Sequence, residues 1–72
     1  MYVDWSSGAK SQYNMLHSSL QSEVDGLIET IKTFPESGKD YGSYRAMAFN
    51  NYQVQYKVSG GTVHILDIPH IK

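Results

Sequence analysis

The chain has 72 residues, a formal net charge of −1 and no cysteine. This length accommodates one small domain spanning residues 1–72, and the lack of cysteine excludes a disulfide framework and a thiolate metal site. The near-zero charge argues against a strong non-specific grip on phosphates, and no apolar run approaches the roughly 20 residues that span a bilayer. No basic segment followed by an apolar stretch opens the chain, so we expect a cytoplasmic protein without a signal peptide.

The first half of the chain predicts a short strand and a first helix. Residues 2–5 alternate weakly, as a short strand does, and Ser6 and Ser7 offer side-chain oxygens that suit a helix N-cap. Apolar residues then recur at spacings of four, three and four, which is typical of one face of a helix. This stripe comprises Ala9, Tyr13, Leu16 and Leu20.

A second helix is expected to follow. Ser22 and Asp25 resemble a capping box, with Asp in place of the usual Glu. The apolar stripe of this helix comprises Val24, Leu27, Ile28 and Ile31. Phe34 should end it, because the residue before a proline, here Pro35, is pushed out of the helical region.

The second half predicts a loop and three strands. Residues 35–43 form a loop by composition, and residues 44–49, 52–58 and 62–68 are strand candidates. Asn50 and Asn51 suit a two-residue hairpin turn, because Asn tolerates positive φ. The last strand has apolar residues at both odd and even positions, as a strand buried on both faces would have. Pro69 should end its pairing, because proline has no N–H to donate.

These elements predict an α+β fold in the order β-α-α-β-β-β, with a helical hairpin packed on one face of a small antiparallel sheet. With a single helical layer, the opposite face of the sheet stays open. Gln53, Gln55 and Lys57 share the polar parity of their strand and should lie on this open face. The expected core comprises Leu16, Leu20, Leu27, Ile28, Ile31, Val54, Tyr56, Ile65 and Leu66.

Residues 44–70 resemble the RelE/ParE toxin superfamily of bacterial toxin–antitoxin modules. The matching features are Tyr44-Arg45, the tight turn at residues 50–51, the Tyr-x-Val-x-Tyr pattern of residues 52–56, and His70 after an apolar strand. In this family, RelE-like members cleave messenger RNA on the ribosome and ParE-like members inhibit DNA gyrase. Both kinds bind a small antitoxin that wraps the toxin surface.

The chain also departs from the nuclease pattern of that family. Gln53 stands where nuclease relatives place an arginine, and Asp67 stands where many place a basic residue. Arginine suits phosphate because its planar fork holds two oxygens, whereas glutamine is neutral. After His70 the chain has Ile71 instead of arginine. The resemblance therefore implies weak or absent ribonuclease activity.

His70 matches the closing histidine of the family and is the candidate general acid or base. Its alternative role is a strand-end histidine bonded to solvent or backbone. His64 is expected to be structural and His17 exposed, and the three histidines share no metal-ligand spacing, so we expect neither a metal nor a cofactor.

The candidate binding residues lie in the first two of the three strands predicted for the second half of the chain. They are Arg45, Gln53, Gln55, Tyr56 and Lys57. Arg45 either contacts phosphate or pairs with Asp40 or Asp67. Lys57 has the alternative role of a solvated lysine.

The sequence thus favours a toxin-like component of a type II toxin–antitoxin system that acts mainly by binding a host target. The alternatives are a RelE-like messenger-RNA endoribonuclease with a reduced site and a non-toxic phage or plasmid adaptor of the same fold. Expected partners are a cognate antitoxin, DNA gyrase or the ribosome with its messenger RNA, and a second copy of the chain, but no membrane. Residues 1–38 hold five acidic and two basic residues (−3), and residues 39–72 hold two acidic and four basic residues (+2), so an anionic partner would meet the second half.

Overall fold

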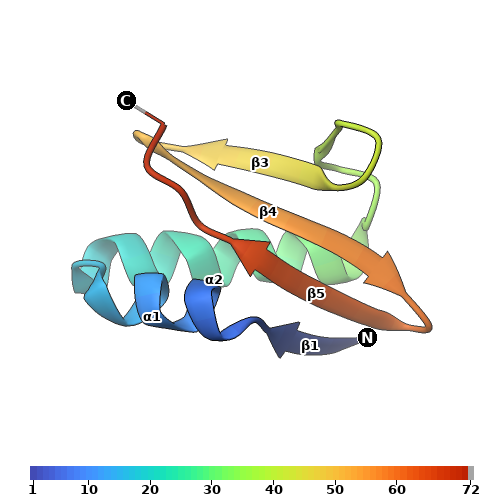
Figure 1. The fold of residues 1–72 in the computed structure, drawn as a ribbon, viewed down its shortest axis with the longest axis horizontal. Helices are drawn as coiled ribbons and strands as arrows, with labels where there is room; N and C mark the ends of the chain where they lie inside the picture. The colour runs from blue at the N-terminus through green and yellow to red at the C-terminus, as the bar shows by residue number, and fades with distance from the viewer. Residues whose placement is uncertain (72) are drawn as a thin grey trace.

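A computed structural model describes residues 1–71 (Figure 1). In chain order the elements are β1 Tyr2–Trp5, α1 Ser7–Met15, α2 Ser18–Thr33, β2 Lys39–Asp40, β3 Arg45–Phe49, β4 Tyr52–Ser59 and β5 Thr62–Asp67. One five-stranded sheet has the order β1-β5-β4-β3-β2, and the expected α+β fold is confirmed. The sheet is mixed and not wholly antiparallel, because β1 pairs in parallel with β5. Neither helix within residues 1–71 has the length and apolar character needed to cross a bilayer.

The two helices meet at a break that the sequence pattern placed too late. The apolar stripe predicted one helix through Leu20, but α1 ends at Met15 and Leu16 adopts an extended conformation. A hydrogen bond from Gln21 Nε2 to the Tyr13 carbonyl oxygen, at 2.8 Å, links the two helices across this break. α2 begins at Ser18, and the predicted capping box at Ser22 lies inside it.

The boundaries that the sequence predicted from capping and turn residues are confirmed. The Ser6 side chain caps α1 by accepting a hydrogen bond from the Ala9 amide. Phe34 is the C-cap of α2, as expected of a residue before proline. In the β3–β4 hairpin, Asn50 has a φ of 49°, which supports the predicted turn.

The core lies between α2 and one face of the sheet. Its buried residues are Ala9, Val24, Ile28, Ile31, Phe49, Val54, Tyr56, Val63, Ile65 and Ile68. The antiparallel register pairs Arg45 with Tyr56 and Met47 with Val54, so the odd-numbered residues of β3 share this face. The core prediction is confirmed for five residues, and Leu16, Leu20 and Leu27 are partly buried against the core.

Leu66 was predicted to be in the core, and this is wrong. The register shifts so that Tyr56 pairs with Ile65 while Gln55 pairs with Asp67, which leaves Leu66 as an extra residue in a β-bulge. Its side chain is 37% exposed. The prediction that β5 is buried on both faces also fails, because only Val63 and Ile65 of this strand are buried.

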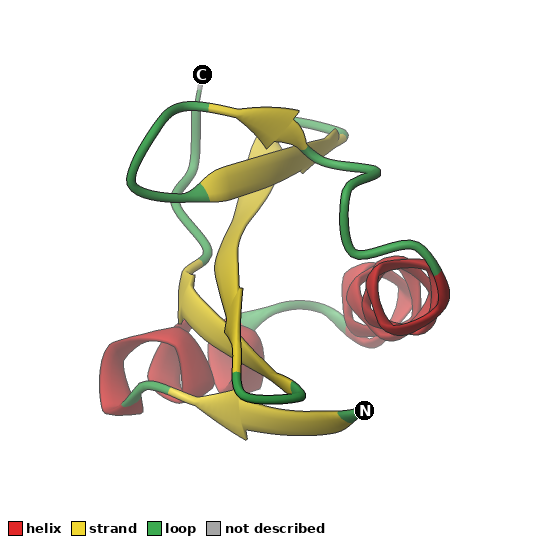
Figure 2. Cartoon of the chain, turned by 90° about the vertical axis from the view of Figure 1, so that its right-hand side faces the viewer, coloured by secondary structure: helices red, strands yellow, loops and turns green. Residues whose placement is uncertain are grey.

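The helices occupy different positions around the sheet (Figures 1 and 2). α2 lies across the back of the strands in Figure 1 and contacts β3, whereas α1 contacts β5. Ser6 Oγ donates to the Leu66 carbonyl oxygen, and Gln12 Oε1 accepts from the Ile68 amide, so α1 is fixed beside the end of β5. The face of the sheet opposite α2 therefore remains open over β4 and β5.

Candidate functional site

A row of polar side chains on β4 forms the open face, as predicted. Gln53, Gln55 and Lys57 alternate with the buried residues Val54 and Tyr56. Gln55 Nε2 donates to Gln53 Oε1 at 2.9 Å, and both glutamines are half-buried, whereas Lys57 is exposed. The amide pair is therefore held in one orientation, which leaves one amide nitrogen and one amide oxygen for a ligand.

A first cleft lies beside Lys57, at the β1 end of the open face. Its volume is about 310 Å³, and its lining comprises Asp4, Ser6, Lys57, Ser59, His64 and Leu66. His64 Nδ1 lies 3.4 Å from Asp4 Oδ2, across the parallel β1–β5 register. The sequence gives no indication of this pair, because Asp4 is 60 residues away from His64 and has no local signal of its partner.

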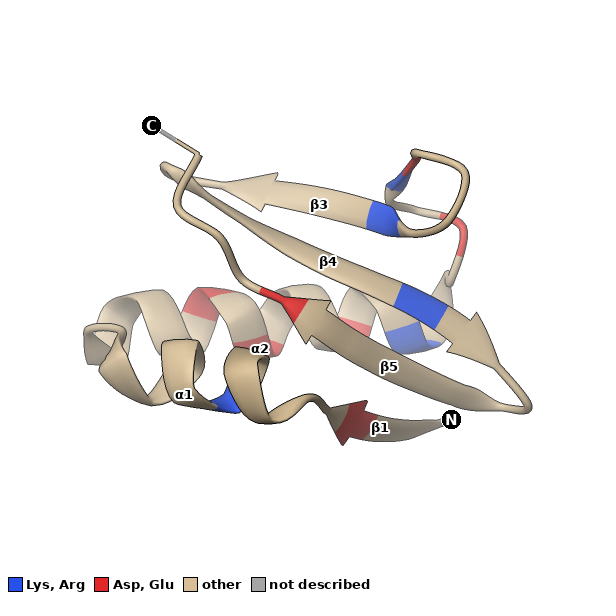
Figure 3. Ribbon diagram, viewed as in Figure 1, with Lys and Arg blue, Asp and Glu red and all other residues tan. Residues whose placement is uncertain are grey.

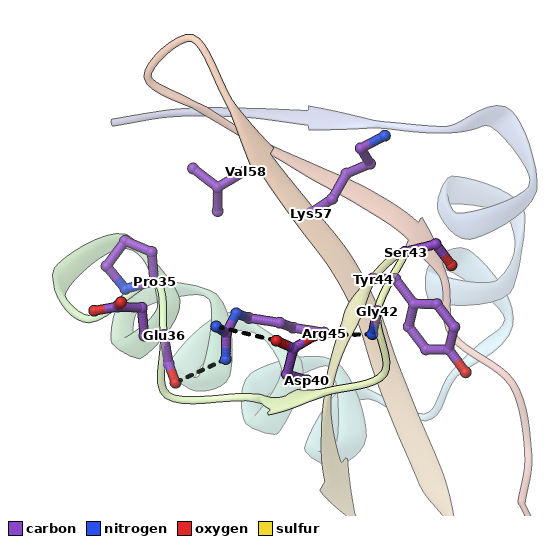
Figure 4. A pocket seen from close by; sticks show the side chains of 9 residues that line it. All are labelled: Pro35, Glu36, Asp40, Gly42, Ser43, Tyr44, Arg45, Lys57 and Val58. Carbon is purple, nitrogen blue, oxygen red and sulfur yellow. Dashed lines mark hydrogen bonds and ion pairs between the residues drawn. The ribbon is translucent and has the colours of Figure 1, made fainter.

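A second cleft lies on the other side of Lys57 (Figure 4). Its volume is about 360 Å³, and it is lined by Pro35, Glu36, Asp40, Gly42, Ser43, Tyr44, Arg45, Lys57 and Val58. Lys57 thus borders both clefts, and it makes no ion pair within residues 1–71. In Figure 3 the basic segments of β3 and β4 lie at the same end of the sheet.

The guanidinium of Arg45 forms most of its hydrogen bonds with the loop that precedes β3. Its Nη1 donates to the carbonyl oxygens of Gly38 at 2.9 Å and Glu36 at 3.3 Å. Its Nη2 lies 3.8 Å from Asp40 Oδ2, so of the predicted alternatives the structure shows the pairing with Asp40. The guanidinium therefore holds the wall of the second cleft, and only part of its charge is available to a ligand.

Tyr56 was a predicted binding residue, and the structure corrects this. Its side chain is fully buried, its hydroxyl donates to the Pro35 carbonyl oxygen at 2.7 Å, and it accepts from the Gly38 amide at 3.0 Å. A hydroxyl with both partners inside the protein has no contact to offer a ligand. Tyr56 instead anchors the loop that Arg45 also holds.

His70 lies apart from the polar row. It forms an isolated bridge with Tyr52, whose ring it contacts edge-on at a centroid distance of 4.8 Å. Because residues opposite each other in a bridge share a face, His70 lies on the core face with Tyr52, in a cleft of about 240 Å³. That cleft is lined by Gln12, Met15, Leu16, Tyr52, Ile68 and His70. The fold therefore does not bring His70 onto the face that carries Lys57.

Two further features limit the chemistry of the open face. Asp67 pairs with Gln55 in the register, and its Oδ1 accepts from the Ile68 amide at 3.0 Å, so a carboxylate lies at this face. Within residues 1–71 no group of three His, Asp or Glu side chains could hold a metal ion.

Away from the open face, Tyr13 of α1 donates a hydrogen bond to Asp25 of α2, and this bond raises the pKa of the tyrosine.

No protein-family model matches the sequence, and no curated protein is significantly similar to it. Solved structures, however, match it over nearly the whole chain. The intact E. coli RelBE toxin–antitoxin complex matches with a TM-score of 0.85 and 15% identity, over 99% of this chain and 96% of that chain. The protein has a RelE-like fold. The isolated E. coli RelE toxin also matches, with a TM-score of 0.85 and 13% identity, over 99% of this chain and 84% of that chain.

The RelE-like fold confirms the resemblance seen in residues 44–70 and extends it to the first half of the chain. At this level of identity the similarity concerns the fold. Any assignment of activity must therefore come from the side chains that this chain places on the RelE-like sheet. Those side chains are the two glutamines, Lys57 and the His64–Asp4 pair.

Proposed function

We propose that the protein is a toxin-like component of a bacterial type II toxin–antitoxin module, which acts mainly by binding a host target and is neutralised by an antitoxin. The RelE-like fold supports this role, and one of the matching structures is a toxin–antitoxin complex. The proposed targets are DNA gyrase or the ribosome, both in the bacterial cytoplasm.

One observation carries the binding-only interpretation: within residues 1–71, Lys57 is the only cation of the open face that makes no ion pair, and His70 is not beside it. Cleavage of RNA by its own 2′-hydroxyl builds negative charge on the phosphate, which the enzyme must stabilise with charged donors. Gln53 and Gln55 are neutral and bonded to each other, and Arg45 is held by Asp40 and two carbonyl oxygens. The face is therefore better suited to docking than to phosphate chemistry.

Induced expression in bacteria tests this proposal. We expect growth to slow without new cleavage sites in messenger RNA, as read by primer extension. The purified protein should inhibit gyrase supercoiling or bind ribosomes. The matched variants are Lys57→Gln, which changes the open face, and Lys10→Gln, which removes an exposed lysine from α1. Normal growth on expression would contradict the toxin-like role and favour the non-toxic adaptor.

A reduced ribonuclease is the second candidate, and the second cleft supports it. There Lys57 and Arg45 line one cavity of about 360 Å³, large enough for a nucleotide phosphate and sugar. If this candidate is correct, primer extension should show ribosome-dependent cleavage that is lost in Lys57→Gln. Cleavage that instead depends on His70 would show that the sheet rearranges on the ribosome.

A further inference from the structure

The outer edge of β1 is free to pair with another strand. β1 is the first strand of the sheet, and no segment lies beyond it in Figure 1. The amides of Tyr2 and Ser6 donate to carbonyl oxygens of residues 61 and 65, on the β5 side. Because backbone groups alternate along a strand, the N–H and C=O groups of Val3 and Trp5 point outward. Four aligned backbone groups are thus available at this edge.

A cleft of about 240 Å³ lies between β1 and α2, next to this edge. Val3, Trp5 and Ile28 provide its apolar surface, and Asp25 and Glu29 provide its acidic surface. The two carboxylates are four residues apart on α2, so they lie on one side of that helix. Each has one recorded partner within residues 1–71, Tyr13 for Asp25 and Lys32 for Glu29, and each has a second oxygen without one.

We propose that this edge binds an extended basic segment of a partner protein by strand addition. In an antiparallel pairing, the partner residues opposite Val3 and Trp5 would exchange backbone hydrogen bonds with them and point to the same face. That face is the one covered by α2, so these side chains enter the cleft. A lysine or arginine there lays its aliphatic stem on Trp5 and Ile28 and brings its charge to Asp25 and Glu29.

Charge distinguishes this occupant from a second copy of the chain. Residues 1–38 have a net charge of −3, so pairing two β1 edges would bring two acidic surfaces together. A cation also already lies at the Trp5 ring, since Lys10 Nζ is 5.1 Å from its centroid. The cleft between β1 and α2 does not include Lys57, which lies on the opposite face of the sheet, so the inference does not depend on the proposed toxin role.

Titration of the ¹⁵N-labelled full chain with a capped peptide, Thr-Lys-Thr-Val-Thr-Lys-Thr, tests the inference by NMR. The lysines and the valine share one parity and would face the cleft. We expect shifts at Val3, Trp5 and Glu29, and slower exchange of the Val3 and Trp5 amides. A peptide with glutamate in place of both lysines should not bind, and N-methylation of its central valine should abolish pairing.

Protein variants separate the charge from the backbone contribution. Asp25→Asn with Glu29→Gln should weaken binding by about three- to tenfold, as expected for two exposed ion pairs, while the matched change Glu36→Gln should leave it unchanged. Val3→Pro removes an outward N–H without touching the β5 side and should abolish binding, with the fold checked by circular dichroism.

Three results would overturn the inference. The first is the absence of shifts at Val3 and Trp5 at millimolar peptide, and the second is equal binding of the lysine and glutamate peptides. The third is concentration-dependent dimerisation through β1 without peptide, measured by sedimentation, which would make a second copy the occupant.

Discussion

At the scale of single residues, Tyr56 links the sheet to the loop before β3. Its buried hydroxyl satisfies the Pro35 carbonyl oxygen and the Gly38 amide. Tyr56→Phe would leave both groups without a partner, so we expect a loss of about 1–3 kcal/mol in the free energy of unfolding. Urea denaturation measures this loss. Tyr52→Phe is the control, because no hydrogen bond of the Tyr52 hydroxyl is found within residues 1–71, and equal effects of the two changes would contradict the anchoring role.

Neighbouring residues of β5 provide a second residue-scale prediction. Ile65 is fully buried, whereas Leu66 is 37% exposed because of the bulge. Ile65→Ala should therefore cost about 2–4 kcal/mol of unfolding free energy through a cavity. Leu66→Ala should cost less than about 1 kcal/mol, because solvent already reaches the site. A larger loss for Leu66 would show that the register shift between β4 and β5 is wrong.

At the scale of elements, two glycines should respond in opposite directions to replacement by alanine. At Gly26 in α2 an added Cβ meets nothing within 4 Å, so Gly26→Ala should stabilise the protein by about 0.5–1 kcal/mol through helix propensity. At Gly38 a Cβ would lie 2.7 Å from the Tyr56 hydroxyl oxygen. Gly38→Ala should therefore destabilise the loop by about 1–3 kcal/mol, as measured by thermal unfolding.

The stabilisation from the hydrogen bond between α1 and α2 should be lost at alkaline pH. Tyr13 donates a hydrogen bond to Asp25, which raises the pKa of Tyr13 in the folded state. A raised folded-state pKa means that the stabilisation is complete below the unfolded value, about 10, and is lost as pH rises through the folded value. Tyr13→Phe should remove this part of the pH dependence, as measured by urea unfolding at several alkaline pH values. An unchanged profile would show that the hydrogen bond contributes nothing in solution.

At the scale of the whole molecule, the RelE-like sheet supports one polar face whose charge is low. Gln53→Arg would place a cation on that face, next to Gln55. We expect this change to raise RNA affinity and to steepen its salt dependence by about one phosphate contact. Filter binding at several salt concentrations measures both quantities. Asn51→Arg, at the exposed hairpin turn, is a control for added charge, and equal gains from both variants would show non-specific attraction.

His70→Ala gives a further whole-molecule test. Because His70 lies with Tyr52 and not beside Lys57, its removal should leave toxicity on expression unchanged and the fold intact. Growth curves with matched protein levels measure this. A loss of toxicity without a loss of stability would assign His70 a direct role in target binding.

The sequence by itself determined the features that depend on neighbouring residues. Helical spacing, the proline after Phe34, the Asn50-Asn51 turn and the alternation in β4 predicted the elements, and they correctly placed Gln53, Gln55 and Lys57 on one face. These predictions succeed because backbone conformation and side-chain parity follow from interactions over a few residues.

Only the tertiary structure decided which of these residues meet. The parallel pairing of β1 with β5 brings Asp4 to His64 and leaves an edge with free backbone groups, and the bulge in β5 exposes Leu66. The fold also directs Arg45 to the loop carbonyl oxygens and places His70 beside α1. These outcomes depend on contacts between segments far apart in the chain, and no local pattern of residues encodes such contacts, because each element can pack in several registers with the same side chains buried.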